Sequence, residues 1–163
     1  MAPKPHSRFR VLSDSVETKP SATHEVFVYG SLLPGLHNHG LLRGSMFLGN
    51  CRTSPDFEMF SMGHFPAVCR EGQTAICGAL YRVDDATLGL LDQLESHPSW
   101  YRRELVDLVP SSGSAPARHE AWMYILPRTE PEVQGGWAEI VPSGDWFAFH
   151  NQQQARTLAR AQK

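Results

Sequence analysis

Short runs of β-branched and aromatic residues, separated by turn residues, dominate the hydrophobic pattern between residues 25 and 126. Such runs predict strands, because these side chains pack well on a pleated surface. The first run, residues 25–29, ends at a Gly-Ser pair that predicts a tight turn. Gly78 lies inside a later run and predicts a bulge, a corner or a close backbone approach. The further candidate strands cover residues 46–51, 57–62, 75–83, 104–109 and 120–126, and together they predict a curled or closed sheet.

One helix is expected within this strand pattern, over residues 85–96. The Asp84-Asp85 pair offers an N-cap, and the His97-Pro98 pair ends the run. Three leucines recur at near-helical spacing between these signals, at Leu88, Leu91 and Leu94.

Glu95 has a charged side chain on the apolar stripe of this helix. It follows Leu91 by four positions and Leu88 by seven, so its carboxylate is aimed at the core. Burial and the negative end of the helix dipole would both raise its pKa toward neutrality, where a general base works best. The alternatives are a structural ion pair with Arg102 or Arg103, or a stripe edge where the carboxylate reaches water.

The turn after the first strand has a composition suited to holding an anion. Gly30 permits close ligand approach, and successive backbone N–H groups in such a turn can form an anion-binding nest. The alternative is an ordinary strand-ending turn with Tyr29 packed in the core. A phosphate site is not indicated, because neither GxxxxGK[ST] nor GxGxxG occurs in the sequence.

Composition and charge narrow the classes of function. The chain has 163 residues, of which 41% are hydrophobic and 20% charged, and this is typical of one globular domain. Because the formal net charge is -2 and the chain has no Lys/Arg cluster, we do not expect a nucleic-acid partner. No apolar run approaches the roughly 20 residues needed to cross a membrane, and a signal-peptide pattern is missing, so we expect a cytoplasmic protein.

The chain divides into three parts by composition. Residues 1–23 mix polar residues with few apolar ones and predict a disordered extension. Residues 24–150 contain all the strand and helix signals and form the predicted domain. Residues 151–163 form a tail that could be helical.

Other chemistries find little support in the residues. The cysteines Cys51, Cys69 and Cys77 lack CxxC spacing, so we interpret them as small hydrophobic residues. His37 and His39 would share one side of a strand, but no HExxH motif or nearby carboxylate completes a metal site, and none is expected. Ser31 lacks a GxSxG context and an assignable His, which disfavours a nucleophilic role.

Taken together, the motifs resemble the gamma-glutamylcyclotransferase-like superfamily, most closely its gamma-glutamylamine cyclotransferase branch. The resemblance extends from about residue 25 to residue 146 and rests on VFVYGSLLPG, Asn38-His39, GALYRVDD, LDQLESHPSWYRR, AWMYIL and SGDW. It implies an α+β fold, a small mixed β-barrel with flanking helices, whose cavity holds a gamma-glutamyl group. It implies no cofactor.

The resemblance also implies roles for particular residues. The family's catalytic Glu falls on Glu95. The substrate-holding loop falls on Tyr29, Gly30, Ser31 and Leu32, with the backbone amides of the last three as donors. Tyr101, Arg103 and Tyr124 carry over as substrate-binding or cavity-shaping residues.

The implied partner is a small gamma-glutamyl substrate. Its alpha-amine would attack its own gamma-carbonyl and release 5-oxoproline with a free amine or amino acid, while Glu95 moves the protons. The leaving amine stays open at this point. The tryptophans are expected in the core or at its rim, and some could line the leaving-group end (Trp100, Trp122, Trp137 and Trp146). The alternative function is a non-catalytic protein that uses the same cavity to bind or sense a small molecule.

Overall fold

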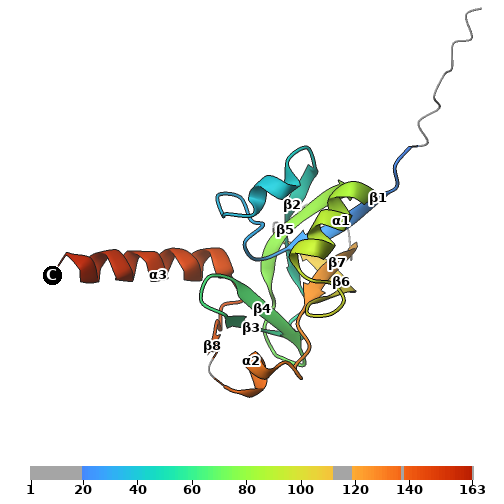
Figure 1. Cartoon of the computed structure of the whole chain (residues 1–163). Helices are drawn as coiled ribbons and strands as arrows, with labels where there is room; N and C mark the ends of the chain where they lie inside the picture. The colour runs from blue at the N-terminus through green and yellow to red at the C-terminus, as the bar shows by residue number, and fades with distance from the viewer. Residues whose placement is uncertain (1–19, 112–118, 137, 163) are drawn as a thin grey trace, which may run out of the picture.

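The computed structural model describes residues 20–111, 119–136 and 138–162. Within these residues, five strands close into a mixed barrel (Figure 1). Their order is β1 (Thr23–Val28), β5 (Cys77–Asp84), β2 (Met46–Thr53), β6 (Arg102–Pro110) and β7 (His119–Ile125). Neighbouring strands are antiparallel, except that β1 and β7 run parallel where Val26 pairs with Trp122. The fold class expected from the resemblance is confirmed.

A second sheet and several helices complete the described fold. The sheet has the order β4 (Pro66–Arg70), β3 (Phe57–Ser61), β8 (Glu139–Ile140). The helices are η1 (His39–Leu42), α1 (Asp85–Leu94), α2 (Pro131–Gln134) and α3 (Trp146–Ala161). Figure 1 shows α1 beside the barrel and α3 projecting away from the body of the molecule.

Strand β1 is buried on both faces, and its residues alternate between two cores. Val26 and Val28 pack in a cluster that includes Leu88 and Leu91 of α1. Phe27 and Tyr29 point to the other side, into a cluster that includes residues of β6 and β7. This alternation follows from the two-residue period of a strand. Because β1 is fixed on both sides, the loop that follows it starts from a rigid point.

The main departures from the predicted elements are local. β4 and β8 were not predicted, since β4 starts at Pro66 and β8 has only two residues. β3 was predicted, but it lies in the second sheet and not in the barrel. Helix α1 ends at Leu94 and not at residue 96, because Ser96 has a φ of 51° and leaves the helical region.

The two ends of the chain compare differently with expectation. Of the predicted disordered extension, residues 1–19 lie outside the described residues, and Thr23 already belongs to β1. The C-terminal tail continues α3, whose first turn is capped by the Asp145 carboxylate accepting from the Ala148 N–H at 3.0 Å. Trp146 anchors this helix in the core, whereas Leu158 near its far end is exposed.

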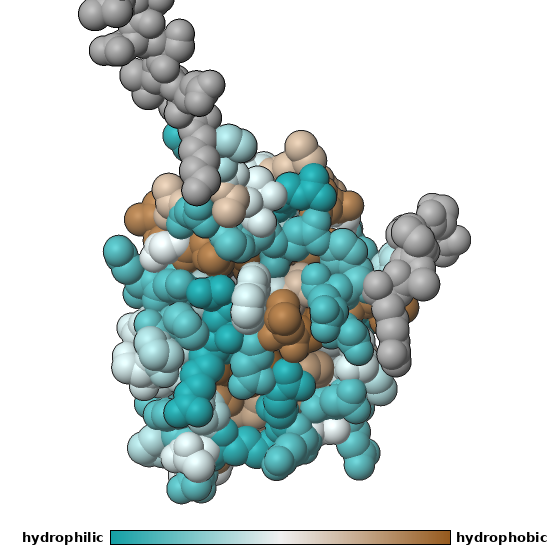
Figure 2. Space-filling model, turned by 90° about the vertical axis from the view of Figure 1, so that its right-hand side faces the viewer, coloured by the Kyte–Doolittle hydropathy of each residue, from teal (hydrophilic) through white to brown (hydrophobic). Residues whose placement is uncertain are grey.

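One face of the described part has the surface of an ordinary globular domain. Figure 2 shows that the coloured residues on the side facing right in Figure 1 are mostly hydrophilic, with small separate hydrophobic patches. Such isolated patches need no partner. None of the helices in the described ranges is both long and apolar enough to cross a membrane.

The close approach predicted at Gly78 occurs between β5 and the end of β1. A Cβ added to Gly78 would lie 2.3 Å from the Val28 carbonyl oxygen and 2.6 Å from Phe27 Cζ. We therefore expect Gly78→Ala to lower the free energy of unfolding by about 3 kcal/mol, because overpacking would push the two strands apart. Urea unfolding measures this change.

The matched control for this substitution is Gly89→Ala on α1, where an added Cβ meets nothing within 4 Å. This variant should be as stable as the wild type or more stable by up to about 1 kcal/mol, because alanine favours helix. Equal stability of Gly78→Ala and Gly89→Ala would contradict the close packing of β1 against β5.

Candidate active site

A cavity of about 210 Å³ opens beside the end of β1. Four parts of the chain line it: the end of β1 with the loop that follows, the β3–β4 turn with the start of β4, the end of α1 with the segment that follows, and Tyr124 of β7. Of the eight residues with predicted site roles, seven line this cavity: Tyr29, Gly30, Ser31, Leu32, Glu95, Tyr101 and Tyr124. Arg103 is the eighth, and it is not among the lining residues.

The loop after β1 lines the cavity and contains backbone N–H groups without an acceptor among the described residues. Among the described residues, the N–H groups of Gly30, Ser31 and Leu32 have no backbone or side-chain acceptor, whereas the next N–H, of Leu33, donates to the Gly30 oxygen at 2.9 Å. A Cβ on Gly30 would lie 2.8 Å from Pro66 Cγ, so this position requires glycine. The loop can therefore offer amide donors to an anion in the cavity.

Asn38 and His39, further along the chain, hold this loop in place. Asn38 donates its side-chain amide to Ser31 Oγ at 2.9 Å and its backbone N–H to the Ser31 oxygen at 3.0 Å. His39 Nδ1 lies 2.8 Å from the Leu32 oxygen. His37 and His39 lie in turns and in η1, so the expectation that both would lie on one side of a strand is wrong. The Ser31 hydroxyl accepts from Asn38, and within the described ranges no histidine bonds to it.

Glu95 follows directly on α1 and lines the same cavity. Its N–H donates to the Leu91 oxygen at 3.0 Å, and its carbonyl oxygen accepts from the Tyr101 N–H at 3.3 Å. Burial raises the pKa of the Glu95 carboxyl from 4.5 to about 7. In the part of the chain that the structure describes, neither Arg102 nor Arg103 pairs with it, which removes the structural ion pair as an explanation of its burial.

Asp92 is the residue that Arg103 contacts, and sequence reasoning did not single it out. The guanidinium of Arg103 donates to both Asp92 oxygens, at 3.0 and 3.2 Å, and lies 4.6 Å from the Trp122 ring centroid. Tyr124 donates its hydroxyl to Asp92 Oδ1 at 2.7 Å. Arg103 and Tyr124 thus hold the last turn of α1 against the barrel, three residues before Glu95.

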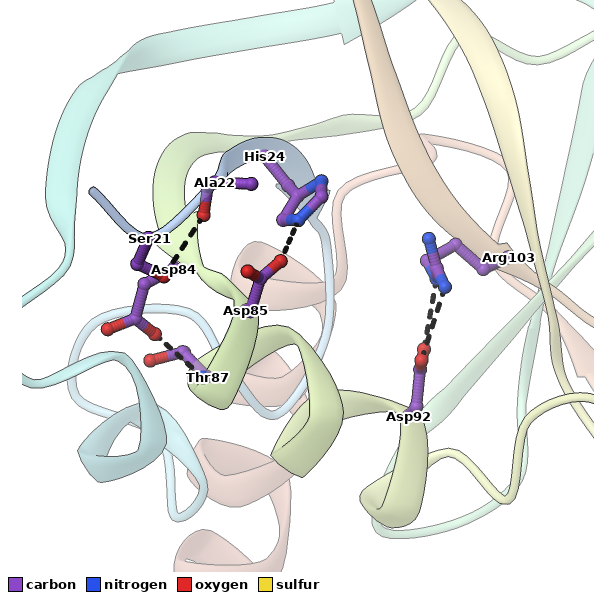
Figure 3. Close-up of polar contacts among 8 residues, drawn as sticks. All are labelled: Ser21, Ala22, His24, Asp84, Asp85, Thr87, Asp92 and Arg103. Atoms are coloured by element: carbon purple, nitrogen blue, oxygen red, sulfur yellow. Dashed lines mark hydrogen bonds and ion pairs between the residues drawn. The ribbon is translucent and has the colours of Figure 1, made fainter. Parts of the chain in front are cut away.

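Figure 3 shows that α1 is held at both ends. At its start, the Asp84 carboxylate accepts from the Thr87 N–H at 2.8 Å, and Asp85 pairs with His24 of β1 at 2.6 Å. At its end, Asp92 faces the Arg103 guanidinium (Figure 3). A helix fixed at both ends gives the residue after it, Glu95, a defined position.

Three tyrosines surround Glu95, and each keeps its hydroxyl protonated. Burial raises the pKa of Tyr29, Tyr101 and Tyr124, and the negative charge of Glu95 adds to the increase in each case. Tyr29 donates to the Tyr124 carbonyl oxygen at 2.6 Å, and Tyr101 donates to the Pro66 carbonyl oxygen at 3.1 Å. Their hydroxyls thus tie together the segments that form the cavity.

Several other lining residues had no signal strong enough to single them out from the sequence. His37 and Phe65 lie in turns, where hydrophobic periodicity carries no information, whereas Pro66 begins β4 and Leu94 ends α1. Trp100 was one of four tryptophans considered for such a place, whereas Trp146 lies in the core and Trp137 lies outside the described residues. Besides Trp100, the lining residues without a predicted site role are Phe27, Val28, His37, Asn38, Phe65, Pro66 and Leu94.

Comparison with known proteins identifies the family. The family described as "Gamma-glutamyl cyclotransferase, AIG2-like" matches residues 26–148. The chain belongs to this family. A Vibrio cholerae protein named as a candidate gamma-glutamylcyclotransferase is 35% identical over 123 residues, which cover 76% of this chain and 95% of that protein. The "Gamma-glutamylaminecyclotransferase C" of Danio rerio is 30% identical over 122 residues, covering 68% of this chain and 80% of that protein.

A solved structure supports the fold independently. The crystal structure of an AIG2-like protein from Mus musculus superposes with a TM-score of 0.64 at 23% sequence identity, covering 76% of this chain and 88% of the mouse chain. At this level of identity the similarity concerns the fold alone. The barrel that carries the cavity is therefore the fold of an AIG2-like cyclotransferase.

Proposed function

We propose that this protein is a gamma-glutamyl cyclotransferase that converts a gamma-glutamyl amide into 5-oxoproline and a free amine. One observation carries the proposal: the cavity combines a carboxyl group, Glu95, whose pKa lies near 7, with backbone N–H groups that have no acceptor among the described residues. Such a cavity provides a proton carrier and an anion site without any further group.

The substrate contains its own nucleophile, so the protein has to fold it and move its protons. Glu95 takes a proton from the alpha-ammonium, and the freed amine attacks the gamma-carbonyl carbon. Glu95 then gives that proton to the nitrogen of the scissile amide and takes the second one from the attacking nitrogen as the amide C–N bond breaks. The new C–N bond closes the lactam, and Glu95 passes the second proton to the departing amine. The amine thus leaves as an ammonium and Glu95 is ionised again, so atoms and charge balance.

The loop after β1 would hold the substrate in the folded pose. The N–H groups of Gly30, Ser31 and Leu32 suit the alpha-carboxylate, and one of them suits the oxyanion of the tetrahedral intermediate. Fixing the amine close to the carbonyl can contribute roughly 7–11 kcal/mol to catalysis in favourable cases. The side chains of Tyr29, Tyr101 and Tyr124 line the same cavity and would limit the conformations of the bound substrate.

The charges around the cavity favour an amide of a simple amine over an amide of an amino acid. No lysine or arginine occurs among the described residues that line the cavity. The carboxylate of an amino-acid leaving group would lie close to the scissile nitrogen and therefore close to Glu95. Repulsion between this carboxylate and the Glu95 carboxylate would disfavour binding. We therefore propose that the protein acts on gamma-glutamylamines.

Release of 5-oxoproline tests the proposal. Purified protein is incubated with gamma-glutamylamines and gamma-glutamyl amino acids of increasing size, and 5-oxoproline is quantified by mass spectrometry. We expect turnover of at least one gamma-glutamylamine. A folded protein that binds these compounds and releases no 5-oxoproline would instead be a small-molecule sensor.

A further inference from the structure

Three apolar side chains line the cavity while keeping part of their surface accessible. Phe65 and Trp100 are half-buried, and Leu94 is 36% exposed. The rings of Phe65 and Trp100 meet edge to face, with centroids 6.0 Å apart and an interplanar angle of 82°. Trp100 also meets Tyr101 edge to face at 5.0 Å. These contacts fix the two aromatic rings at the cavity before any ligand binds.

The segments that carry these side chains are tied to each other. Phe65 belongs to the turn between β3 and β4, and Trp100 belongs to the segment after α1. The Tyr101 hydroxyl donates to the carbonyl oxygen of Pro66, the residue after Phe65, at 3.1 Å. Leu94 and Trp100 lie on either side of Glu95 in the chain. These apolar side chains therefore line the same cavity as the carboxyl that would hand a proton to the leaving amine.

The charges of the lining give a charged leaving group little support. Among the described lining residues, Glu95 is the one carboxylate and His37 the one imidazole, and lysine and arginine are missing. For a leaving group with a carboxylate, the one basic side chain among the described lining residues is that of His37, in the loop after β1. A leaving group with a second ammonium would stabilise ionised Glu95 and so oppose its role as proton donor. An uncharged hydrocarbon group has neither disadvantage and gains from burial.

We propose that the preferred leaving group is an amine with an uncharged hydrocarbon substituent, aromatic or branched, which packs against Phe65, Leu94 and Trp100. This rests on the proposed function, because it names the substrate class for the same cavity. Phe65 and Trp100 are then specificity-determining residues that contact the leaving group and take no part in proton transfer.

Three substrates of similar size test the proposal on the wild-type protein. They are gamma-glutamylbenzylamine, gamma-glutamylphenylglycine, which adds one carboxylate to the benzylamine, and gamma-glutamyl-1,4-diaminobutane, which ends in an ammonium. We expect kcat/KM for the benzylamide to exceed the other two by at least roughly tenfold, because hydrophobic pockets discriminate by such factors or more. Equal or higher kcat/KM for either charged substrate would overturn the inference while leaving the proposed cyclisation to 5-oxoproline intact. No 5-oxoproline from any of the three, nor from gamma-glutamylmethylamine, would reject the proposed function itself.

Substitutions assign the preference to the named residues. Phe65→Ala and Trp100→Ala should each lower kcat/KM for the benzylamide by roughly tenfold and change it for gamma-glutamylmethylamine by less than about threefold. Phe47→Ala is the matched control, since Phe47 is an aromatic residue with 52% exposure outside the cavity lining. Equal losses on both substrates would assign a structural role to these rings, and no loss on the benzylamide would place its binding elsewhere. Trp100→Phe keeps an aromatic ring and should retain the benzylamide preference.

Discussion

Replacing Glu95 with glutamine should lower the release of 5-oxoproline by roughly 10²–10⁴-fold, the range that positioned acid–base groups contribute. Glutamine keeps the size of the side chain and removes the titrating proton, while the backbone bonds of Glu95 to Leu91 and Tyr101 stay available. The loss should fall on kcat, because the substrate-holding amides belong to a different segment. Single-turnover rates with a gamma-glutamylamine measure it.

Glu104→Gln is the matched control for this substitution. Glu104 lies on β6 and forms a surface ion pair with Arg70 at 2.6 Å, outside the cavity lining. Its loss should leave the rate within about twofold, as exposed ion pairs contribute little. If Glu95→Gln retains more than about a tenth of the wild-type rate in a folded protein, the proton carrier is another group and the proposed mechanism fails.

The parts of the site that the sequence predicted are those encoded by continuous segments. The first strand and its Gly-Ser turn follow from one hydrophobic run and its end. The helix before Glu95 follows from Leu88, Leu91 and the Asp84 cap, and the structure has both leucines buried and the cap in place. The partial burial of Glu95 after these leucines was predictable for the same reason. The site roles of these residues remain predictions that the experiments above address.

The parts that the sequence did not predict depend on contacts between distant segments. Phe65 reaches the cavity because β3 pairs with β4. Strand β4 was not predicted from the sequence, because it starts at a proline. In the sequence, Asp92 is an ordinary polar position on α1. It anchors the helix because β6 and β7 bring Arg103 and Tyr124 within hydrogen-bond distance of it. Leu94 has the spacing of a core leucine, yet the helix ends there and leaves it partly exposed.

The burial of Glu95 links the proposed chemistry to stability. An ionised carboxylate in an apolar place costs free energy, and the raised pKa is the measure of that cost. The anchors of α1, namely the Asp84 cap and the Asp92–Arg103 pair, offset it by holding the helix end in place. We infer that the protein keeps a locally unfavourable carboxylate because the reaction needs a group that titrates near neutral pH.

The pH dependence of stability should reveal this cost. The Glu95 carboxyl has a pKa of about 7 in the folded protein against 4.5 for an ordinary glutamate, so the folded state binds more protons than the unfolded state between these values. Its contribution to stability is therefore present below pH 4.5 and is lost as the pH rises through 7. Glu95→Gln cannot titrate, so its free energy of unfolding relative to wild type should increase with pH, by about 3 kcal/mol over the whole interval.

Urea unfolding of both proteins at a series of pH values from about 4.5 to about 8 measures this difference. Glu104→Gln again serves as the control, and its difference from wild type should stay nearly constant because Glu104 is exposed. A stability difference that does not change with pH would mean that Glu95 titrates as an exposed glutamate.

The activity should depend on the same titration. The wild-type kcat/KM should fall tenfold per pH unit below about 7, because protonated Glu95 cannot accept the substrate's proton. A kcat/KM that stays constant down to about pH 5 would mean that the base is not Glu95.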